Sequence, residues 1–308
     1  MELGQGVRPH WSTLPSHVVT EVERWLGGPI SSVTEVRGGF SPAVAARVAS
    51  GTRRGFVKAC GPTDNRFTIG MYREETRIAA ALPDIPALAP LRWSYDDGDW
   101  AVLGFDDLSG GPPQLPWADA DLDAALDAVR TVHAALTPTP VRAPTAEAGH
   151  ARMFAGWRKL TGDEPELDAW SRRHLASLQD AEAQWPADLV GDTLLNGDLR
   201  ADNIVLSPGR GPVVVDWPAA NVGPAWFDVA CMAPSVEAQG GPRCADLLPR
   251  AGLVAPADAL AFAVVGVAGY FTANALRPAP PGMPTLRMFQ ARQGLPARAW
   301  AAELLGLP

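Results

Sequence analysis

The sequence is poor in the residues that build disulfide frameworks and metal clusters. Its 308 residues include only three cysteines, widely spaced and without a CxxC pair, and five histidines that share no ligand spacing. An odd number of scattered cysteines argues against a disulfide framework or a zinc site. The N-terminal residues also lack a basic start followed by an apolar run, so we expect a reduced, cytoplasmic protein.

Positive charge and long apolar runs are scarce as well. Lys and Arg number 26 against 34 Asp and Glu, which gives a net charge of −8. This balance disfavours nucleic acid or an anionic membrane as partner and would suit a cationic small molecule, although it could simply keep the protein soluble. The nearly continuous apolar stretch 260–271 is shorter than the ~18 residues that cross a bilayer, so we expect a buried core helix there.

The chain is long enough, and at 47% hydrophobic residues apolar enough, to fill two packed lobes. Short strand-like runs at 33–36, 43–49 and 55–59, the helical segment MYREETRIAAAL and the strand WAVLGF predict an antiparallel sheet with one helix in the first hundred residues. Ala- and Leu-rich periodicity then predicts helices at 120–136, 146–160, 165–185 and 256–276. We therefore expect an α+β protein with an N-terminal lobe (1–105), a linker (106–116) and a helical C-terminal lobe (117–308).

The segment TLLNGDLRADNIVLSPGRGPVVVDW interrupts the helical half. Its two β-branched runs flank a turn-rich hexamer, which predicts a hairpin. Asn203 precedes the first strand and Asp216 follows the second, so antiparallel pairing brings their oxygens to one end, where they could share a Mg²⁺ ion. Asp198 lies five residues before Asn203. This D-x-x-x-x-N spacing followed by a hairpin and another Asp is the catalytic-loop arrangement of kinases, although each residue alone could be a turn or cap.

NGDLRADNIVL, VVVDW and GPAWFDVA together resemble the signature of the aminoglycoside phosphotransferase and choline kinase superfamily, and the resemblance covers most of the chain. It implies a two-lobed protein-kinase-like fold. It also implies that Asp198 is the catalytic base, that Asn203 and Asp216 are the Mg²⁺ ligands, and that Asp228 is a buried anchor for the catalytic loop.

The same resemblance assigns a nucleotide site to the first lobe. RGGFSPAV is similar to the family's phosphate loop, and Lys58 would reach the α- and β-phosphates, steadied by Glu75, with the adjacent Glu74 as the alternative. LGFDDLSGG resembles the inter-lobe linker, whose backbone would bond the base. The residues so assigned are Gly39, Phe40, Ser41, Lys58, Glu75, Asp106 and Leu108.

The expected function is therefore transfer of the γ-phosphoryl group of ATP or GTP to a hydroxyl of an aminoglycoside-like compound or another small metabolite, in antibiotic resistance or biosynthesis, by a monomer or homodimer. Only eleven residues separate Asp216 from Asp228, too few for a protein-kinase activation loop. Asn196 stands where the family has a His before Gly-Asp, so the alternative is a nucleotide-binding regulatory pseudokinase. Four acidic residues could contact a cationic acceptor or be solvated helix ends: Asp163, Glu164, Glu166 and Glu237.

Overall fold

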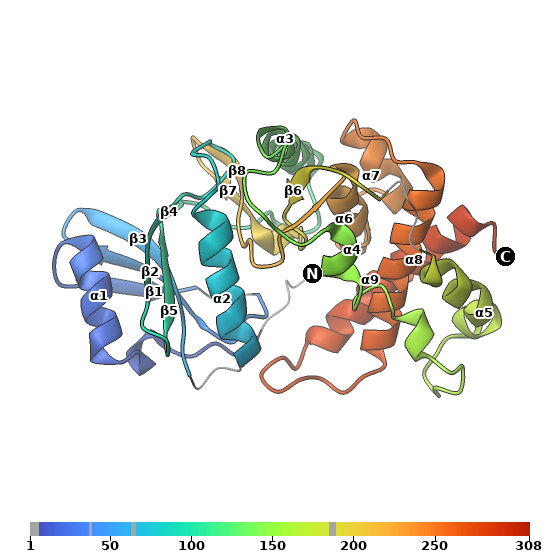
Figure 1. Ribbon diagram of the computed structural model, residues 1–308, viewed down its shortest axis with the longest axis horizontal. Coiled ribbons are helices and arrows are strands. Elements are labelled where there is room, and N and C mark those ends of the chain that lie inside the picture. Colours follow the sequence, from blue (N-terminus) through green and yellow to red (C-terminus); the bar gives the residue numbers. More distant parts are fainter. Residues whose placement is uncertain (1–5, 37–38, 63–65, 185–188) are drawn as a thin grey trace.

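The computed structural model describes residues 6–36, 39–62, 66–184 and 189–308. Two lobes lie side by side (Figure 1): a sheet flanked by two helices, and a larger, mainly helical part that contains the hairpin. The linker around residues 106–118 joins them. This arrangement confirms the expected α+β, two-lobed class.

The N-terminal lobe is a five-stranded antiparallel sheet in the order β1-β2-β3-β5-β4. Helices α1 and α2 cover its opposite faces (Figure 1). Side chains alternate along a strand, so Val57 and Ala59 pack on the α1 side while Cys60 packs on the α2 side with Tyr72. Lys58 therefore faces α2. The bounds are α1 Ser16–Leu26, β1 Ser32–Glu35, β2 Val44–Ser50, β3 Arg53–Cys60, α2 Arg66–Ala79, β4 Leu91–Asp96 and β5 Ala101–Phe105.

Helix α1 shows that the expectation of one helix in the first hundred residues was wrong. Val18, Val22 and Leu26 recur every fourth residue and are buried against the sheet. Gly27 ends the helix in the left-handed conformation, with φ of 77°. The signal was therefore present in the sequence, but the β-branched pair at 18–19 lowers helix propensity and obscures it.

The C-terminal lobe contains the expected hairpin and three of the expected helices. Helix α5 begins four residues later than expected, because the carboxylate of Asp168 caps it by accepting the N–H of Ser171 at 2.9 Å; the expected end at Trp185 lies outside the described residues. The sequence analysis missed α6, α7 and α9. The bounds are α3 Asp119–Ala135, α4 Ala146–His150, α5 Ala169–Ala183, β6 Thr193–Leu195, β7 Ile204–Ser207, β8 Gly211–Val214, β9 Asn221–Gly223, α6 Trp226–Ala238, α7 Cys244–Arg250, α8 Ala257–Ala275 and α9 Leu286–Leu305.

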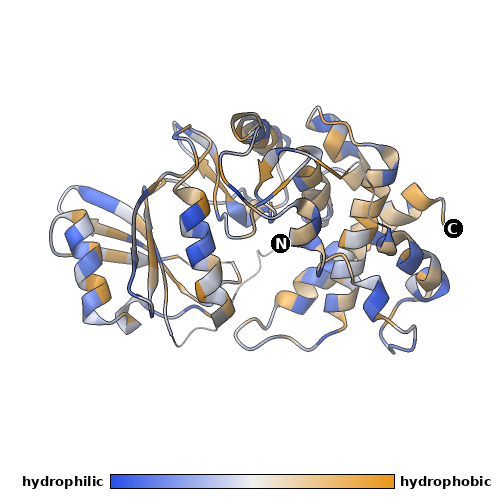
Figure 2. Cartoon of the chain, in the orientation of Figure 1, coloured by the Kyte–Doolittle hydropathy of each residue, from blue (hydrophilic) through white to orange (hydrophobic). Residues whose placement is uncertain are grey.

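Helix α8 runs through the interior of this lobe. It is long and apolar enough to cross a membrane by length and composition, but 61% of its most apolar window is buried inside the protein. Its strongest contacts are with α9, and it also packs against α5 and α6. In Figure 2, α8 is predominantly hydrophobic, whereas α1 and α2 each carry a hydrophilic side. These contacts agree with the expected core helix.

The expected helix at 146–160 was wrong, because it stops at His150 and gives way to turns. Gly156 lies against the backbone of Gly269 in α8, where an added Cβ would be 2.1 Å from the Gly269 carbonyl. The turn lets the fully buried Trp157 donate from Nε1 to the Val265 carbonyl at 2.9 Å. Tertiary packing against α8 therefore overrides local helix propensity here.

We expect Gly156→Ala to lower the free energy of unfolding by about 1–3 kcal/mol, because the new methyl group must push α8 aside. Urea denaturation measures this change. Gly70→Ala in α2 is the matched control, since an added Cβ there meets nothing within 4 Å, and it should be neutral or slightly stabilising. Equal stability of the Gly156 variant and the wild type would contradict the close packing.

Candidate active site

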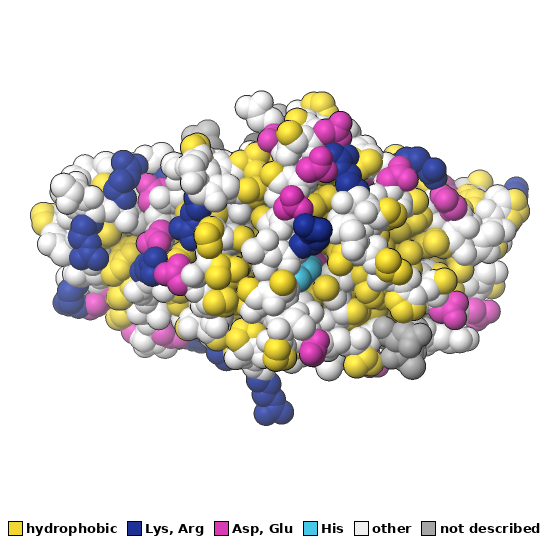
Figure 3. Space-filling view, turned by 90° about the horizontal axis from the view of Figure 1, so that it is seen from above, with side chains coloured by type: hydrophobic (Ala, Val, Ile, Leu, Met, Phe, Trp, Pro, Cys, Tyr) yellow, Lys and Arg dark blue, Asp and Glu magenta, His cyan; other side chains and the backbone are white. Residues whose placement is uncertain are grey.

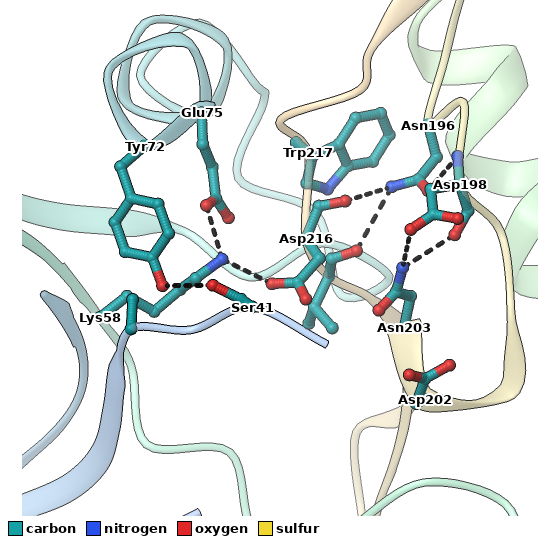
Figure 4. Close-up of polar contacts among 12 residues, drawn as sticks. Ser41, Lys58, Tyr72, Glu75, Asn196, Asp198, Asp202, Asn203, Asp216 and Trp217 are labelled. Atoms are coloured by element: carbon teal, nitrogen blue, oxygen red, sulfur yellow. Dashed lines mark hydrogen bonds and ion pairs between the residues drawn. The ribbon is translucent and has the colours of Figure 1, made fainter. Parts of the chain in front are cut away.

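A buried lysine links the two lobes. Lys58 on β3 donates from Nζ to Glu75 Oε2 on α2 at 2.5 Å and to Asp216 Oδ1 after β8 at 2.7 Å (Figure 4). Glu74 pairs instead with Arg77. The helix register thus selects Glu75, as the sequence analysis preferred, because one residue along α2 turns the side chain away from the sheet.

Burial and mutual attraction set the charges of this cluster. Burial alone would lower the pKa of Lys58, but the carboxylates of Asp216 and Glu75 outweigh it and hold that pKa above its ordinary value. Burial would likewise raise the pKa of Asp216, and the Lys58 charge instead lowers it. Because the pKa of Lys58 is raised and that of Asp216 is lowered, this ion pair stays charged. The cleft therefore keeps the Lys58 cation beside the Asp216 carboxylate.

The hairpin brings Asn203 and Asp216 together at one end, as the sequence predicted. Ile204 pairs with Val214, and the ladder continues where Val215 donates its N–H to the Asn203 carbonyl at 3.0 Å. Asp216 has a φ of 60°, a conformation uncommon for a residue other than glycine. Such strain persists only where contacts enforce it. Here Lys58 holds the side chain and Asn196 binds the carbonyl of Asp216.

Asp228, at the start of α6, anchors the loop that carries Asp198. Its carboxylate is 2% exposed and accepts the N–H groups of Asn196 at 2.7 Å and Gly197 at 2.9 Å. His133 on α3 lies 3.1 Å from the same carboxylate through Nε2. Spacing along the sequence gave none of the five histidines a ligand role, and the structure gives His133 a positioning contact.

Asn196 braces this loop against the end of the hairpin. Its side-chain amide donates to the Asp216 carbonyl at 2.8 Å and more weakly to that of Val215 at 3.3 Å, while its Oδ1 accepts the N–H of Asp198 at 3.2 Å (Figure 4). The amide therefore joins the segments that carry Asp198 and Asp216, a task that needs both a donor and an acceptor.

We expect Asn196→Ala to lower kcat about tenfold, because each lost hydrogen bond contributes about 0.5–1.5 kcal/mol to holding the two segments in register. Steady-state nucleotide turnover measures this, with thermal unfolding run alongside to establish that the variant is folded. A folded variant with unchanged kcat would show that Asp228 alone fixes the loop.

Asp198 lies at the centre of the loop, beside Asn203. The Asn203 amide donates to the backbone carbonyl of Asp198 at 2.8 Å and approaches its Oδ2 at 3.4 Å. Enclosure by the cleft, opposed by the charge of Arg200, raises the pKa of Asp198 to about 6, even though the side chain exposes 49% of its surface. A carboxylate in this setting is both accessible and more basic than usual, as a general base requires.

The donor set at the hairpin end fits Mg²⁺ carried by a nucleotide. Because the Asn203 amide N–H₂ is turned toward Asp198, its Oδ1 points away from that residue and is available for a cation. Within the described part of the chain, no group of three or more His, Cys, Asp or Glu residues forms a metal cluster. Mg²⁺ typically uses one or two protein oxygens and completes its shell with phosphate and water, so Asn203 and Asp216 are sufficient.

These residues line two cavities. The first, of about 200 Å³, lies between the lobes and has apolar walls such as Phe56, Phe105 and Val215. The sequence-assigned residues that line it are Gly39, Ser41, Lys58, Asp106, Leu108, Asn203 and Asp216. Arg8, Asp202 and Trp217 line it as well, although the sequence analysis assigned none of them to the site. No sequence motif marked Arg8, which reaches the cavity only through the tertiary fold.

Two of the residues that the sequence assigned to the nucleotide site lie outside the lining of this cavity. Glu75 stands behind Lys58. Phe40 turns toward α9, where its ring meets that of Phe289 at 5.3 Å and lies 5.8 Å from the Arg200 guanidinium. Arg37 and Gly38 of the RGGFSPAV segment lie outside the described residues. A second cavity, of about 100 Å³, is lined by Asp198 and Arg200 from the loop after β6 and by residues of α6, α8 and α9.

Solved structures with the same architecture are phosphotransferases. The spectinomycin phosphotransferase APH(9)-Ia, in complex with ADP and spectinomycin, matches with a TM-score of 0.63 and 10% identity over 95% of this chain and 99% of that chain. Choline kinase LicA from Streptococcus pneumoniae matches with a TM-score of 0.61 and 15% identity, over 94% of this chain and 99% of that chain. A thermostable mutant of the aminoglycoside phosphotransferase APH(4)-Ia, in complex with ADP and hygromycin B, matches with a TM-score of 0.59 and 15% identity, over 93% of this chain and 99% of that chain.

At sequence identities of 10% to 15%, the structural similarity establishes the fold alone. A search of curated protein sequences gives no match. Residues 32–262, which are most of the chain, match the phosphotransferase enzyme family. The chain therefore belongs to that family.

Proposed function

We propose that this protein is an active small-molecule kinase that transfers the γ-phosphoryl group of ATP or GTP to a hydroxyl group of a small acceptor. One observation carries the proposal: a continuous set of contacts joins the nucleotide cavity to Asp198. Lys58 binds Asp216, Asn196 ties Asp216 to Asp198, and Asn203 binds Asp198. A binding protein without turnover would not need this connection.

In the proposed reaction Asp198 accepts the proton of the acceptor hydroxyl, whose oxygen attacks the γ-phosphorus. The bond between the γ-phosphorus and the bridging oxygen breaks, and the nucleoside diphosphate leaves. Lys58 places its charge against the phosphates, and Glu75 holds it there. When bound, Mg²⁺ would be held by Asn203 and Asp216 and would neutralise phosphate charge. Phosphoryl transfer needs little else, because positioning and charge stabilisation supply most of the catalysis.

The alternative, a regulatory pseudokinase, depends on Asn196 in place of histidine. The contacts of Asn196 argue against it, since its amide spans both segments that carry catalytic carboxylates. Two structural relatives are solved in complex with hygromycin B and with spectinomycin, which are small molecules, and this supports a small-molecule acceptor.

Mg²⁺-dependent release of nucleoside diphosphate tests the proposal. ATP and GTP are each supplied to the purified protein with a panel of hydroxylated acceptors, with and without excess EDTA, while calorimetry measures nucleotide binding. We expect acceptor-dependent release that EDTA abolishes. Tight nucleotide binding without any release of nucleoside diphosphate, whether the phosphoryl group would go to an acceptor or to water, would favour the pseudokinase.

A further inference from the structure

We propose that the acceptor is an uncharged hydroxylated compound whose reacting part is small and partly apolar, held by Ser235 and Gln293 rather than by acidic residues. This inference rests on the proposed function, because it takes the cavity beside Asp198 as the acceptor site. It concerns which molecules enter that cavity.

The charges around the cavity are balanced. Its charged lining residues, within the part of the chain that the structure describes, are Asp198 and Arg200, whose Oδ2 and Nη2 atoms are 3.7 Å apart. Arg287 adds positive charge nearby by donating from Nη1 to Gln290 Oε1, on the cavity wall, at 2.8 Å. Arg200 also pairs with Asp202 at 3.0 Å, in the wall of the first cavity. Among the described residues, Asp198 is the one carboxylate on the wall of the second cavity and Arg287 adds positive charge, so electrostatics give a polycation little attraction.

The acidic residues that the sequence offered for a cationic acceptor are elsewhere. Glu237 accepts the N–H of Cys244 at 2.6 Å, and Glu164 accepts those of Thr161 at 2.9 Å and Gly162 at 3.0 Å. Asp163 and Glu166 are exposed, and none of the four lines the cavity. On the face seen in Figure 3, acidic and basic side chains are interspersed, so the net negative charge forms no single acidic surface there. These four acidic residues are therefore better explained as caps and solvated side chains than as groups that bind a cationic acceptor.

Two polar atoms in the cavity wall lack partners. Ser235 on α6 is 2% exposed and Gln293 on α9 is 3% exposed. Ser235 Oγ and Gln293 Nε2 have no hydrogen-bond partner among the residues that the structure describes, and both residues line the cavity. Buried polar atoms are nearly always paired, because an unmet group costs about 1–3 kcal/mol. An acceptor molecule that brings hydroxyl, ether or carbonyl oxygens would satisfy both.

The rest of the wall defines shape and polarity. Leu199, Val267, Phe271 and Phe289 provide apolar surface for hydrocarbon. The space of about 100 Å³ is half that of the first cavity, so the part of the acceptor that enters it is small compared with a nucleotide. A small, partly apolar group that carries the reacting hydroxyl fits these walls.

Matched acceptor pairs test the charge preference. Each pair is an uncharged sugar or sugar alcohol and its amino-substituted analogue, together with polycationic aminoglycosides, and the readout is acceptor-dependent nucleoside diphosphate release. We expect the uncharged member to have at least about a tenfold higher kcat/KM. Preference for the amine or an aminoglycoside, or the absence of release with every uncharged compound, would overturn the inference. Failure of the proposed function is distinguishable, since it would remove Mg²⁺-dependent nucleotide hydrolysis itself.

Two variants test the polar contacts. Ser235→Ala and Gln293→Leu should each raise the acceptor KM about five- to tenfold and leave the nucleotide KM unchanged. Gln184→Leu, at an exposed position, is the matched control and should change neither KM. If both cavity variants keep the wild-type acceptor KM while remaining folded, these side chains do not contact the acceptor.

Discussion

Replacing Asp198 with alanine should lower kcat by about 10²–10⁴-fold, the usual contribution of a general base. Nucleotide affinity should change little, because Asp198 lines the acceptor-side cavity and makes no part of the nucleotide cavity wall. Turnover and the nucleotide Kd, measured on the same preparation, separate the two effects. Asp163→Ala removes an exposed carboxylate from the same lobe and serves as the matched control.

Two results would contradict this role for Asp198. Unchanged turnover would mean that another group accepts the proton. A parallel loss of nucleotide affinity and stability would mean that Asp198 mainly holds the loop, through the contacts of its backbone with Asn196 and Asn203.

Asp228→Ala should be the most destabilising of these substitutions. It removes the acceptor of two buried backbone N–H groups and the partner of His133, leaving them without compensation. Breaking a buried charged contact of this kind costs about 3–5 kcal/mol. Urea denaturation should show a loss of this size, and kcat should fall with it because the Asp198 loop loses its anchor.

Asp246→Ala in the first turn of α7 is the matched control for Asp228. It also removes a helix-start carboxylate, but one that is exposed, and the expected cost is about 0.3–1 kcal/mol. Asp228→Asn keeps one acceptor oxygen and should fall between the two. Equal stability of Asp228→Ala and Asp246→Ala would show that water replaces the anchor.

The sequence by itself determined the parts of the site that are close together along the chain. The turn-rich hexamer between two β-branched runs specifies the hairpin. Antiparallel pairing of its two strands brings their outer ends together, so the proximity of Asn203 and Asp216 could be predicted from the sequence. Asp198 was predicted to belong to the same site from its position five residues before Asn203. Lys58 and Glu75 were assigned by resemblance, and strand alternation together with helix register accounts for their meeting.

Only the tertiary structure decided what depends on contacts between distant segments. The expected helix from residue 146 stops at His150 and the turns after it place Gly156 against α8, and His133 meets Asp228 across 95 residues of chain. Ser235 and Gln293 face a common cavity only once α6 and α9 have packed. Local propensity and spacing act over a few residues, whereas packing of helix faces sets which side chains remain without partners, and that determines which acceptor can bind.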